Sequence, residues 1–486
     1  MKKKKTGIIV LTIFLTLIIL AAGTMATILL LGVIQPSEPQ DSVIAYFANP
    51  RVRSETVAVL LLIASLLPVV VIWLGIALLS RRKKEEVLEV AGAPEGFGRA
   101  PVPEGEDENE KKKDKKDKKI SPDAKKTAVR FSNLSTMDRT MSKRALVSYN
   151  ETISLEEFCN RFRAYAAGAR RLYYDIDDIR RFVASMGVSP IIIMQGMSGT
   201  GKTSLATVFG DFVMNKANVI PIQPMWKERS DMIGYFNEFT ERFNEMPLLN
   251  VLYEAHYSRD LYITVLDEMN IARVEYYFAD FLSLLELPNL KDRMLEVVSD
   301  TWDKDPKLLK GGKLQLPPNM WYIGTANNDD STFAISDKVY DRAMIINLDK
   351  KAKPFATAHT RPVHISYDYW QTLVERAQAE YSLSEENREK LKRLDAYLVE
   401  HFRVTFGNRI MKQINQYVPM YMACGGDELD ALDDMISKKI FRKLETQNPV
   451  YIRNAADGLI SCLDELFGPS AMNQCRDYLR QLQRNA

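Results

Sequence analysis

The sequence contains few of the residues that build metal sites and disulfide frameworks, with only four cysteines and four histidines among 486 residues. Neither set has the spacing of metal ligands, so neither predicts a metal site, and scattered cysteines of this kind are typical of reduced thiols in a cytosolic domain. The net charge is only +2, so any surface that binds a polyanion would have to be local. No internal repeat is present. The residues concerned are Cys159, Cys424, Cys462, Cys475, His256, His359, His364 and His401.

Two long uncharged apolar runs lie near the N-terminus, at 7–34 and 57–80. As a helix the first run would span about 42 Å, which exceeds the ~30 Å hydrocarbon core of a bilayer and allows a tilted crossing. Four basic residues precede the first run and four follow the second, against two between the runs. This bias predicts a two-pass protein of the inner or plasma membrane, with both ends in the cytoplasm. The alternative for the first run is a secretory signal, whose apolar core is usually only about 7–15 residues long.

The segment 85–127 lacks the apolar residues that a folded unit needs. Proline- and glycine-rich sequence gives way to an acidic cluster and then to a block of lysines. Such a segment cannot bury enough apolar surface to order itself, so a solvated linker is predicted. The alternative for the lysine block is contact with anionic lipid. The predicted organisation is a membrane hairpin at 1–84, the linker at 85–127, a helical lead-in at 128–187, a core at 188–350, and C-terminal helices at 351–486.

Beyond the linker, short apolar runs alternate with stretches of helical periodicity. Helical spacing extends from Ser154 to Met186 and returns from about Tyr367, where Ser384 is suited to cap a helix. The runs are almost continuously apolar, which is typical of parallel strands buried on both faces. The sequence therefore predicts an α/β fold with a parallel sheet, followed by helices. The expected strands lie at 190–194, 219–222, 261–266, 321–325 and 344–348.

A glycine-rich loop lies between the first expected strand and a helical stretch. Gly196 and Gly201 enclose four residues and are followed by Lys202 and Thr203. The backbone N–H groups of such a loop bind phosphate, the lysine can reach the β- and γ-phosphates, and the threonine hydroxyl can bind Mg²⁺. The alternative is a glycine-rich turn that binds nothing. The predicted phosphate-binding residues are Gly196, Met197, Ser198, Gly199, Thr200, Gly201, Lys202, Thr203 and Ser204.

Polar side chains end two other expected strands. Asp267 and Glu268 follow one buried strand, where the first carboxylate can hold Mg²⁺ through water and the second can act as a base toward the attacking water. Asn327 follows another strand and can reach the same water or the γ-phosphate. The alternatives are a surface turn for the two acids and an Asx turn for the asparagine.

Two arginines are further candidates. Arg342 lies just before the last expected strand, and Arg409 lies in the first turn of a helix, where a cation is unfavourable unless it meets an anion. The alternative for each is a plain surface charge.

These motifs together resemble an AAA+ ATPase of the branch that contains McrB-type, MoxR-type and dynein-related proteins. The resemblance covers roughly 154–444 and implies a P-loop AAA+ sheet of strand order 5-1-4-3-2, a C-terminal helical lid, and rings, usually hexamers. It also implies that Asn327 is the first sensor, Arg342 an arginine finger for a neighbouring subunit, and Arg409 the second sensor. The segments that carry it are 196–203, 266–270, 324–327 and 406–409, with 226–237 and 311–317 as further matches.

Departures from that branch limit what is carried over. McrB-type proteins have Asn-Thr-Ala-Asp where this chain has Asn-Asn-Asp-Asp at 327–330, so their GTP preference is not transferred, and ATP with Mg²⁺ is assigned. Their paired arginines before the last strand are reduced here to Asp341 and Arg342. The apolar N-terminal part replaces a DNA-binding domain, so restriction of modified DNA is not expected.

The function that follows is a membrane-anchored AAA+ ATPase, a hexameric ring that remodels an unidentified protein or complex at the cytoplasmic face. One alternative is a McrB-like motor that acts on nucleic acid with a nuclease partner, which steeply salt-dependent stimulation by DNA would reveal. Another is a scaffold that binds nucleotide to assemble and turns over little. Binding to nucleic acid is the less favoured of the partner assignments.

Overall fold

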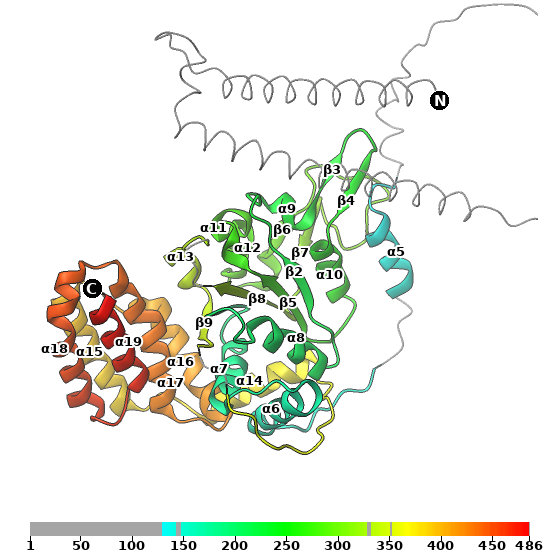
Figure 1. The fold of residues 1–486 in the computed structure, drawn as a ribbon. Coiled ribbons are helices and arrows are strands. Elements are labelled where there is room, and N and C mark those ends of the chain that lie inside the picture. The colour runs from blue at the N-terminus through cyan, green and yellow to red at the C-terminus, as the bar shows by residue number, and fades with distance from the viewer. Residues whose placement is uncertain (1–128, 142–146, 328–331, 350–351, 486) are drawn as a thin grey trace, which may run out of the picture. The chain divides into compact units, whose positions relative to one another are not determined.

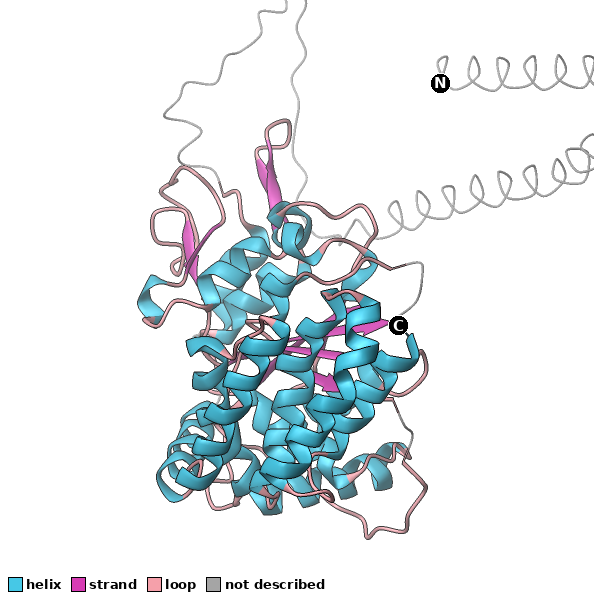
Figure 2. Ribbon diagram, turned by 90° about the vertical axis from the view of Figure 1, so that its left-hand side faces the viewer, coloured by secondary structure: helices cyan, strands magenta, loops and turns pink. Residues whose placement is uncertain are grey.

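The computed structural model describes residues 129–141, 147–327, 332–349 and 352–485. Within these ranges the chain forms a parallel sheet between two layers of helices, followed by a set of C-terminal helices (Figure 1). Figure 2 shows the strands largely enclosed by helices. The glycine-rich loop and the candidate residues other than Arg409 are positioned by this sheet and its connections, whereas Arg409 lies on one of the C-terminal helices.

The central sheet has five strands, and every neighbouring pair is parallel. Their order from one edge to the other is β2-β5-β8-β1-β9. Because the carboxyl ends of parallel strands meet at one edge, the register that pairs Gly196 with Asn327 brings two candidate residues together. The strands are β1 (Ile191–Gly196), β2 (Asn218–Pro221), β5 (Tyr262–Asp267), β8 (Met320–Asn327) and β9 (Met344–Asn347).

Alternate residues of the strands enter two different cores. Ile192 and Met194 of β1 pack with the helices on one face, whereas Ile191 and Ile193 pack with those on the other. This burial of both faces explains the continuous apolar runs of the strands. One layer consists of α6 (Leu155–Arg170), α7 (Ile176–Met186), α8 (Lys202–Phe212) and α14 (Tyr367–Glu380). The other contains α5 (Ser132–Thr140), α9 (Arg229–Ile233), α10 (Pro247–Ala255), η2 (Met269–Ile271), α11 (Val274–Tyr277), α12 (Ala279–Leu285) and α13 (Asp337–Tyr340).

Two antiparallel hairpins are inserted in the connections between sheet strands. The first lies between β2 and β5, and the second between β5 and β8 (Figure 1). The expected strand order, 5-1-4-3-2, is therefore corrected, since it counts five strands and the described chain has nine. The four hairpin strands account for the difference in numbering. They are β3 (Gly234–Asn237), β4 (Arg242–Glu245), β6 (Met294–Glu296) and β7 (Lys313–Gln315), with η3 (Leu290–Asp292) ahead of the second hairpin.

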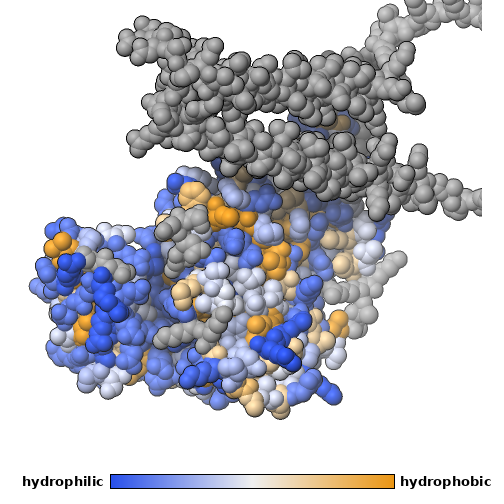
Figure 3. Space-filling view, in the orientation of Figure 1, coloured by the Kyte–Doolittle hydropathy of each residue, from blue (hydrophilic) through white to orange (hydrophobic). Residues whose placement is uncertain are grey.

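The C-terminal helices continue one of the two cores. Apolar side chains of these helices belong to the same cluster as Ile192 and the helices α6 to α8. The Ser384 hydroxyl accepts a hydrogen bond from the Asn387 N–H, which confirms the expected N-cap. The face of these helices seen in Figure 3 is mostly hydrophilic. The elements are α15 (Glu385–Phe402), α16 (Gly407–Ala423), α17 (Glu428–Met435), the π-helical turn η4 (Ile436–Ile440), η5 (Phe441–Thr446), α18 (Pro449–Phe467) and α19 (Asn473–Asn485).

The expected membrane location is corrected. Among the helices within the described ranges, none combines the length and the apolar composition needed to cross a bilayer. The apolar runs at 7–34 and 57–80, on which the two-pass prediction depends, lie outside the described residues. The prediction of a pair of membrane helices and of a membrane location is therefore without support, and it is withdrawn.

Candidate functional site

The glycine-rich loop connects β1 to α8, as a phosphate-binding loop requires. Gly196 and Gly201 have φ values of 141° and 95°, which side-chain-bearing residues rarely adopt. A Cβ at Gly196 would lie 2.4 Å from the Leu348 carbonyl oxygen, so the loop also approaches the end of β9 too closely for any larger residue. At Gly199 a Cβ would meet nothing within 4 Å, so the mouth of the loop is open.

Lys202 is the first residue of α8 and is 6% exposed. Its Nζ donates hydrogen bonds to the carbonyl oxygens of Gly196 and Met197, at 2.9 and 2.8 Å. The ammonium group is therefore held within the curve of the loop, next to a helix N-terminus that carries partial positive charge. Thr203 and Ser204 follow it in the first turn of α8. Positive charge thus converges on the open side of the loop.

Tyr174 supports this loop from outside and was not identified from the sequence. Its hydroxyl donates to the Gly201 carbonyl at 3.0 Å, and Arg163 Nε donates to the Tyr174 carbonyl at 2.9 Å. Burial raises the pKa of the Tyr174 hydroxyl, which therefore stays a neutral donor. A tyrosine before a helix carries no sequence signal for this contact.

The two carboxylate residues at the end of β5 are held by threonines. Asp267 Oδ1 accepts hydrogen bonds from the Thr203 hydroxyl at 2.7 Å and from the Thr325 hydroxyl at 2.8 Å. The Thr325 hydroxyl also accepts the backbone N–H of Glu268 at 2.9 Å. Glu268 has left-handed backbone torsions (φ 53°, ψ 47°), and its side chain is exposed. The structure thus brings Asp267 to the loop and presents Glu268 to solvent beside it.

Asn327 lies at the same edge of the sheet, opposite Gly196 in the register of β8 with β1. Its backbone carbonyl accepts a hydrogen bond from Asn270 Nδ2 at 2.9 Å. Within the described chain, Asn270 Oδ1 and Asn347 Oδ1 are buried without a hydrogen-bond donor. These acceptors leave places for ordered water at the edge where the strands end.

Arg342 and Arg409 are brought together at one carboxylate, and the backbone of Arg342 lies at the end of β1 opposite the loop. Both guanidinium groups form ion pairs with Glu286, which follows α12; the Arg342 pair is 2.8 Å long. The Arg342 carbonyl accepts the Ser189 hydroxyl at 2.9 Å, and Ser189 precedes β1. The six residues of β1 therefore separate this position from the loop, a span of about 20 Å at ~3.3 Å per residue. Glu286 is a second residue that sequence patterns did not indicate.

The donor set fits a nucleoside triphosphate with a divalent cation. The open loop supplies backbone N–H groups and the Lys202 ammonium group, which suit phosphate. The Thr203 hydroxyl and the Asp267 carboxylate, already in contact, are oxygen ligands of the kind that Mg²⁺ prefers, directly or through water. The groups that suit phosphate and those that suit a cation therefore adjoin at the same edge of the sheet.

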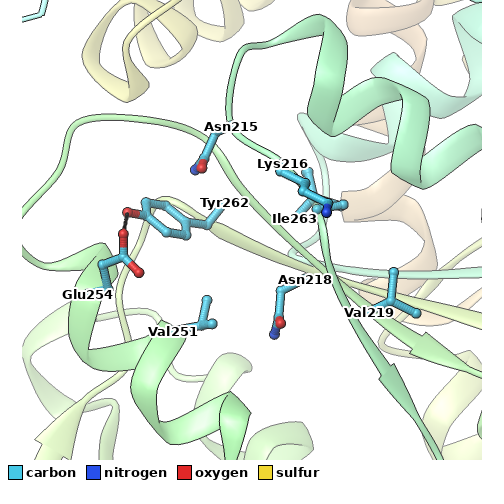
Figure 4. Close-up of a pocket in the computed structure, with 9 residues that line it drawn as sticks. Asn215, Lys216, Asn218, Val219, Val251, Glu254, Tyr262 and Ile263 are labelled. Carbon is cyan, nitrogen blue, oxygen red and sulfur yellow. Dashed lines mark hydrogen bonds between the residues drawn. The ribbon is translucent and has the colours of Figure 1, made fainter. Parts of the chain in front are cut away.

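A separate pocket of ≈ 490 Å³ lies at the opposite ends of β2 and β5 (Figure 4). Asn218 and Tyr262, which line it, begin these two strands, whereas the candidate site lies where the strands end. The Tyr262 hydroxyl donates to Glu254 at 3.4 Å across one side of the pocket. This pocket is therefore not part of the candidate site.

Comparisons with known proteins found a family match for the C-terminal helices and a similar solved structure for a larger part of the chain. Residues 363–486 match a family described as a domain of unknown function, DUF8727, which spans α14 to α19 and none of the sheet. No curated protein matches the chain. Among solved structures, the chain is similar to a full-length MCM homolog from Methanopyrus kandleri, with 10% identity, a TM-score of 0.34, and coverage of 60% of this chain and 61% of that one. The match spans less than two thirds of that protein's length.

Proposed function

We propose that this protein is an ATPase of the AAA+ type that hydrolyses Mg²⁺–ATP at the carboxyl edge of its sheet. One observation carries the proposal: the 2.7 Å hydrogen bond between the Thr203 hydroxyl and Asp267 Oδ1 joins the phosphate-binding loop to the acidic end of β5. A glycine-rich turn without a ligand would have no need of a carboxylate at this position. The contact supports a cation site next to the phosphate site.

Each residue of the edge has a role in this proposal. Lys202 and the loop N–H groups bind the phosphate oxygens, while Thr203 and Asp267 orient the cation. Bound Mg²⁺–ATP supplies the phosphoanhydride that is cleaved and a cation that neutralises developing charge. The exposed Glu268 carboxylate accepts a proton from the attacking water, and the Asn327 amide orients that water. The αL backbone of Glu268, held through its N–H by Thr325, supports this direction of its side chain.

Arg342 and Arg409 act on the site of a second copy of this chain in the same proposal. Their common contact with Glu286, and the position of the Arg342 carbonyl at the start of β1 rather than at its loop end, support action between subunits rather than within one. Arg342 Nε is also buried without a hydrogen-bond acceptor among the described residues. An arrangement of this kind requires a ring or another closed assembly, in which each interface completes one site.

The work that hydrolysis performs is proposed to be the remodelling of a protein or protein complex. The apolar core that joins the sheet to the C-terminal helices supports mechanical coupling between the sheet and these helices. The net charge of only +2 gives the chain as a whole little excess of positive charge, which does not favour nucleic acid as the partner.

The experiment that tests hydrolysis compares Glu268→Gln with Glu296→Gln, which alters an exposed glutamate on β6 that has no role in the proposal. We expect Glu268→Gln to bind ATP with unchanged affinity and to hydrolyse it at least about a hundredfold more slowly, since a positioned base contributes that much. Glu296→Gln should match the wild type. Wild-type turnover in Glu268→Gln would exclude Glu268 as the base, and no turnover in the wild type would favour a nucleotide-dependent scaffold.

A further inference from the structure

Two consecutive lysines of the C-terminal helices are buried. Lys438 and Lys439 lie in the π-helical turn η4, and their exposed fractions are 6% and 3%. A buried ammonium group is unfavourable unless acceptors surround it. Single π-helical turns are rare and are found frequently at functional sites. The hydrogen-bond partners of each lysine therefore indicate the role of that lysine.

The ammonium group of Lys439 forms hydrogen bonds to residues 339–343, the segment that carries Arg342 and is called the arginine segment. Its Nζ donates to the backbone carbonyl of Tyr340 at 2.7 Å and to that of Ala343, one on each side of the arginine. Carbonyls at the end of a short helix such as α13 lack intrahelical donors and carry partial negative charge, which favours a cation there. Burial lowers the pKa of Lys439 to about 7, and the nearby Asp341 carboxylate opposes that shift.

Other side chains of the C-terminal helices, which are less buried than Lys439, also contact the arginine segment. Gln413 of α16 donates to the Asp341 carbonyl at 3.2 Å. The Arg442 guanidinium lies over the Tyr340 ring, 3.7 Å from its centroid. These contacts attach one end of the segment to the C-terminal helices, while Lys439 holds the backbone on both sides of the arginine.

The segment also contacts the strand that leads into the phosphate-binding loop. The Tyr340 hydroxyl accepts a hydrogen bond from Gln195 Nε2, and Gln195 immediately precedes Gly196. One short stretch of chain thus touches β1, carries Arg342, and is bonded to the C-terminal helices through Lys439. A displacement of these helices would be transmitted to the arginine by this route.

We propose that Lys439 is a positioning residue for Arg342, through which the C-terminal helices control how this arginine is presented to a second copy of the chain. The inference rests on the proposed function, in which Arg342 completes a neighbour's site. Lys439 acts through backbone carbonyls and not on the nucleotide. Its loss should therefore slow turnover, which needs the arginine in place, without weakening ATP binding, which depends on the loop of the other subunit.

Lys438 is a matched control, because it is buried in the same turn and has a different partner. Its Nζ pairs with the Asp434 carboxylate. The Arg181 guanidinium contacts the same carboxylate, with Nε 3.1 Å from Oδ1. Lys438→Met consequently removes a buried lysine from η4 and leaves the bonds to the arginine segment in place.

The test compares full-length wild type, Lys439→Met and Lys438→Met by steady-state ATP hydrolysis and thermal unfolding. For Lys439→Met we expect kcat to fall at least about tenfold while KM for ATP stays within about threefold of the wild type. Lys438→Met should keep kcat within about threefold of the wild type, even if its melting temperature falls as far as that of Lys439→Met. Lys439→Gln keeps N–H donors and should recover part of kcat. Wild-type kcat in Lys439→Met, or an equal loss in both Met variants, would overturn the inference.

A second readout does not depend on hydrolysis. Amide hydrogen exchange of residues 339–343 should be faster in Lys439→Met than in the wild type, and unchanged in Lys438→Met. A wild type that hydrolyses no ATP would refute the proposed function, while the exchange would still test the positioning. A wild type that hydrolyses ATP, with exchange unaltered in Lys439→Met, would refute the positioning alone. If Lys439→Met does not fold, Lys439→Gln is compared with Lys438→Gln, and a smaller fall in kcat and a smaller rise in exchange are expected in Lys439→Gln alone; wild-type values in both variants would overturn the inference.

Discussion

The hydroxyl of Thr325 joins the two carboxylate residues of the candidate site. It donates to Asp267 and accepts the backbone N–H of Glu268, and the residue is buried. Thr325→Val keeps the shape of the side chain and removes both bonds. We expect half-maximal ATP hydrolysis to require about tenfold more Mg²⁺, and the free energy of unfolding to fall by about 1 kcal/mol, because the partly buried N–H of Glu268 loses its acceptor.

Thr264→Val is the control for this change. Thr264 is equally buried on β5, but its hydroxyl donates to the Met320 sulfur at 3.6 Å, which is a weak acceptor. Both the Mg²⁺ requirement and the stability of this variant should stay near those of the wild type. An unchanged Mg²⁺ requirement in Thr325→Val would show that Asp267 does not need this threonine to orient a cation.

At the residue scale, the sequence indicated the candidate residues that belong to a recognisable motif. It did not indicate the residues that hold those candidates in place. Lys202, Thr203 and Asp267 belong to patterns that follow strands, and the structure brings them together, while their roles stay predictions. Tyr174 and Thr325 each act through a single hydroxyl on a segment distant in the sequence. Such contacts depend on the packing of the fold and leave no local spacing to read.

At the scale of elements, the short helix α5 depends on a carboxylate from another element. Glu245, the last residue of β4, accepts the backbone N–H groups of Ser132, Asn133 and Leu134 at 2.9–3.0 Å. These are N–H groups that a helix leaves without intrahelical acceptors. Glu245→Ala should lower the free energy of unfolding by about 0.5–2 kcal/mol, as the loss of an N-cap does, and should accelerate amide exchange in residues 132–140. Glu238→Ala, on the turn of the same hairpin, should leave the exchange unchanged; equal exchange in both variants would contradict the capping role.

This dependence explains which elements could be predicted. The sheet strands and the long helices have periodic apolar patterns, and the five expected strands coincide closely with β1, β2, β5, β8 and β9. Helix α5 and the hairpin β3–β4 are short and mostly polar, and their partners are distant; Glu245 lies more than a hundred residues from Ser132. Their stability comes from tertiary contacts, so the sequence pattern alone does not indicate them.

At the scale of the whole molecule, the positions of the two arginines bear on the proposed action between chains. The resemblance implied a finger for a neighbouring subunit at Arg342 and a sensor on the lid at Arg409. The structure brings both to Glu286 instead of separating them. Sequence position could not indicate this pairing, because it depends on how the C-terminal helices pack against α12 and α13. The shared carboxylate also implies that an incoming phosphate must replace Glu286 at these guanidinium groups.

A mixing experiment tests the proposed assembly of several copies of the chain. Arginine fingers accelerate phosphoryl transfer by roughly 10³–10⁵, so Arg342→Ala should bind ATP with near-normal affinity and lose turnover by a factor of that order. Lys202→Ala should also be inactive, because it loses the charge that binds phosphate. When the two variants exchange subunits, some interfaces pair an intact loop with an intact Arg342, and activity should partly return. The control is Arg388→Ala, which alters a half-buried arginine on α15 that is paired with Glu385, and this variant should keep wild-type turnover alone. A mixture as inactive as its components would contradict action between subunits and return Arg342 to the role of a surface charge held by Glu286.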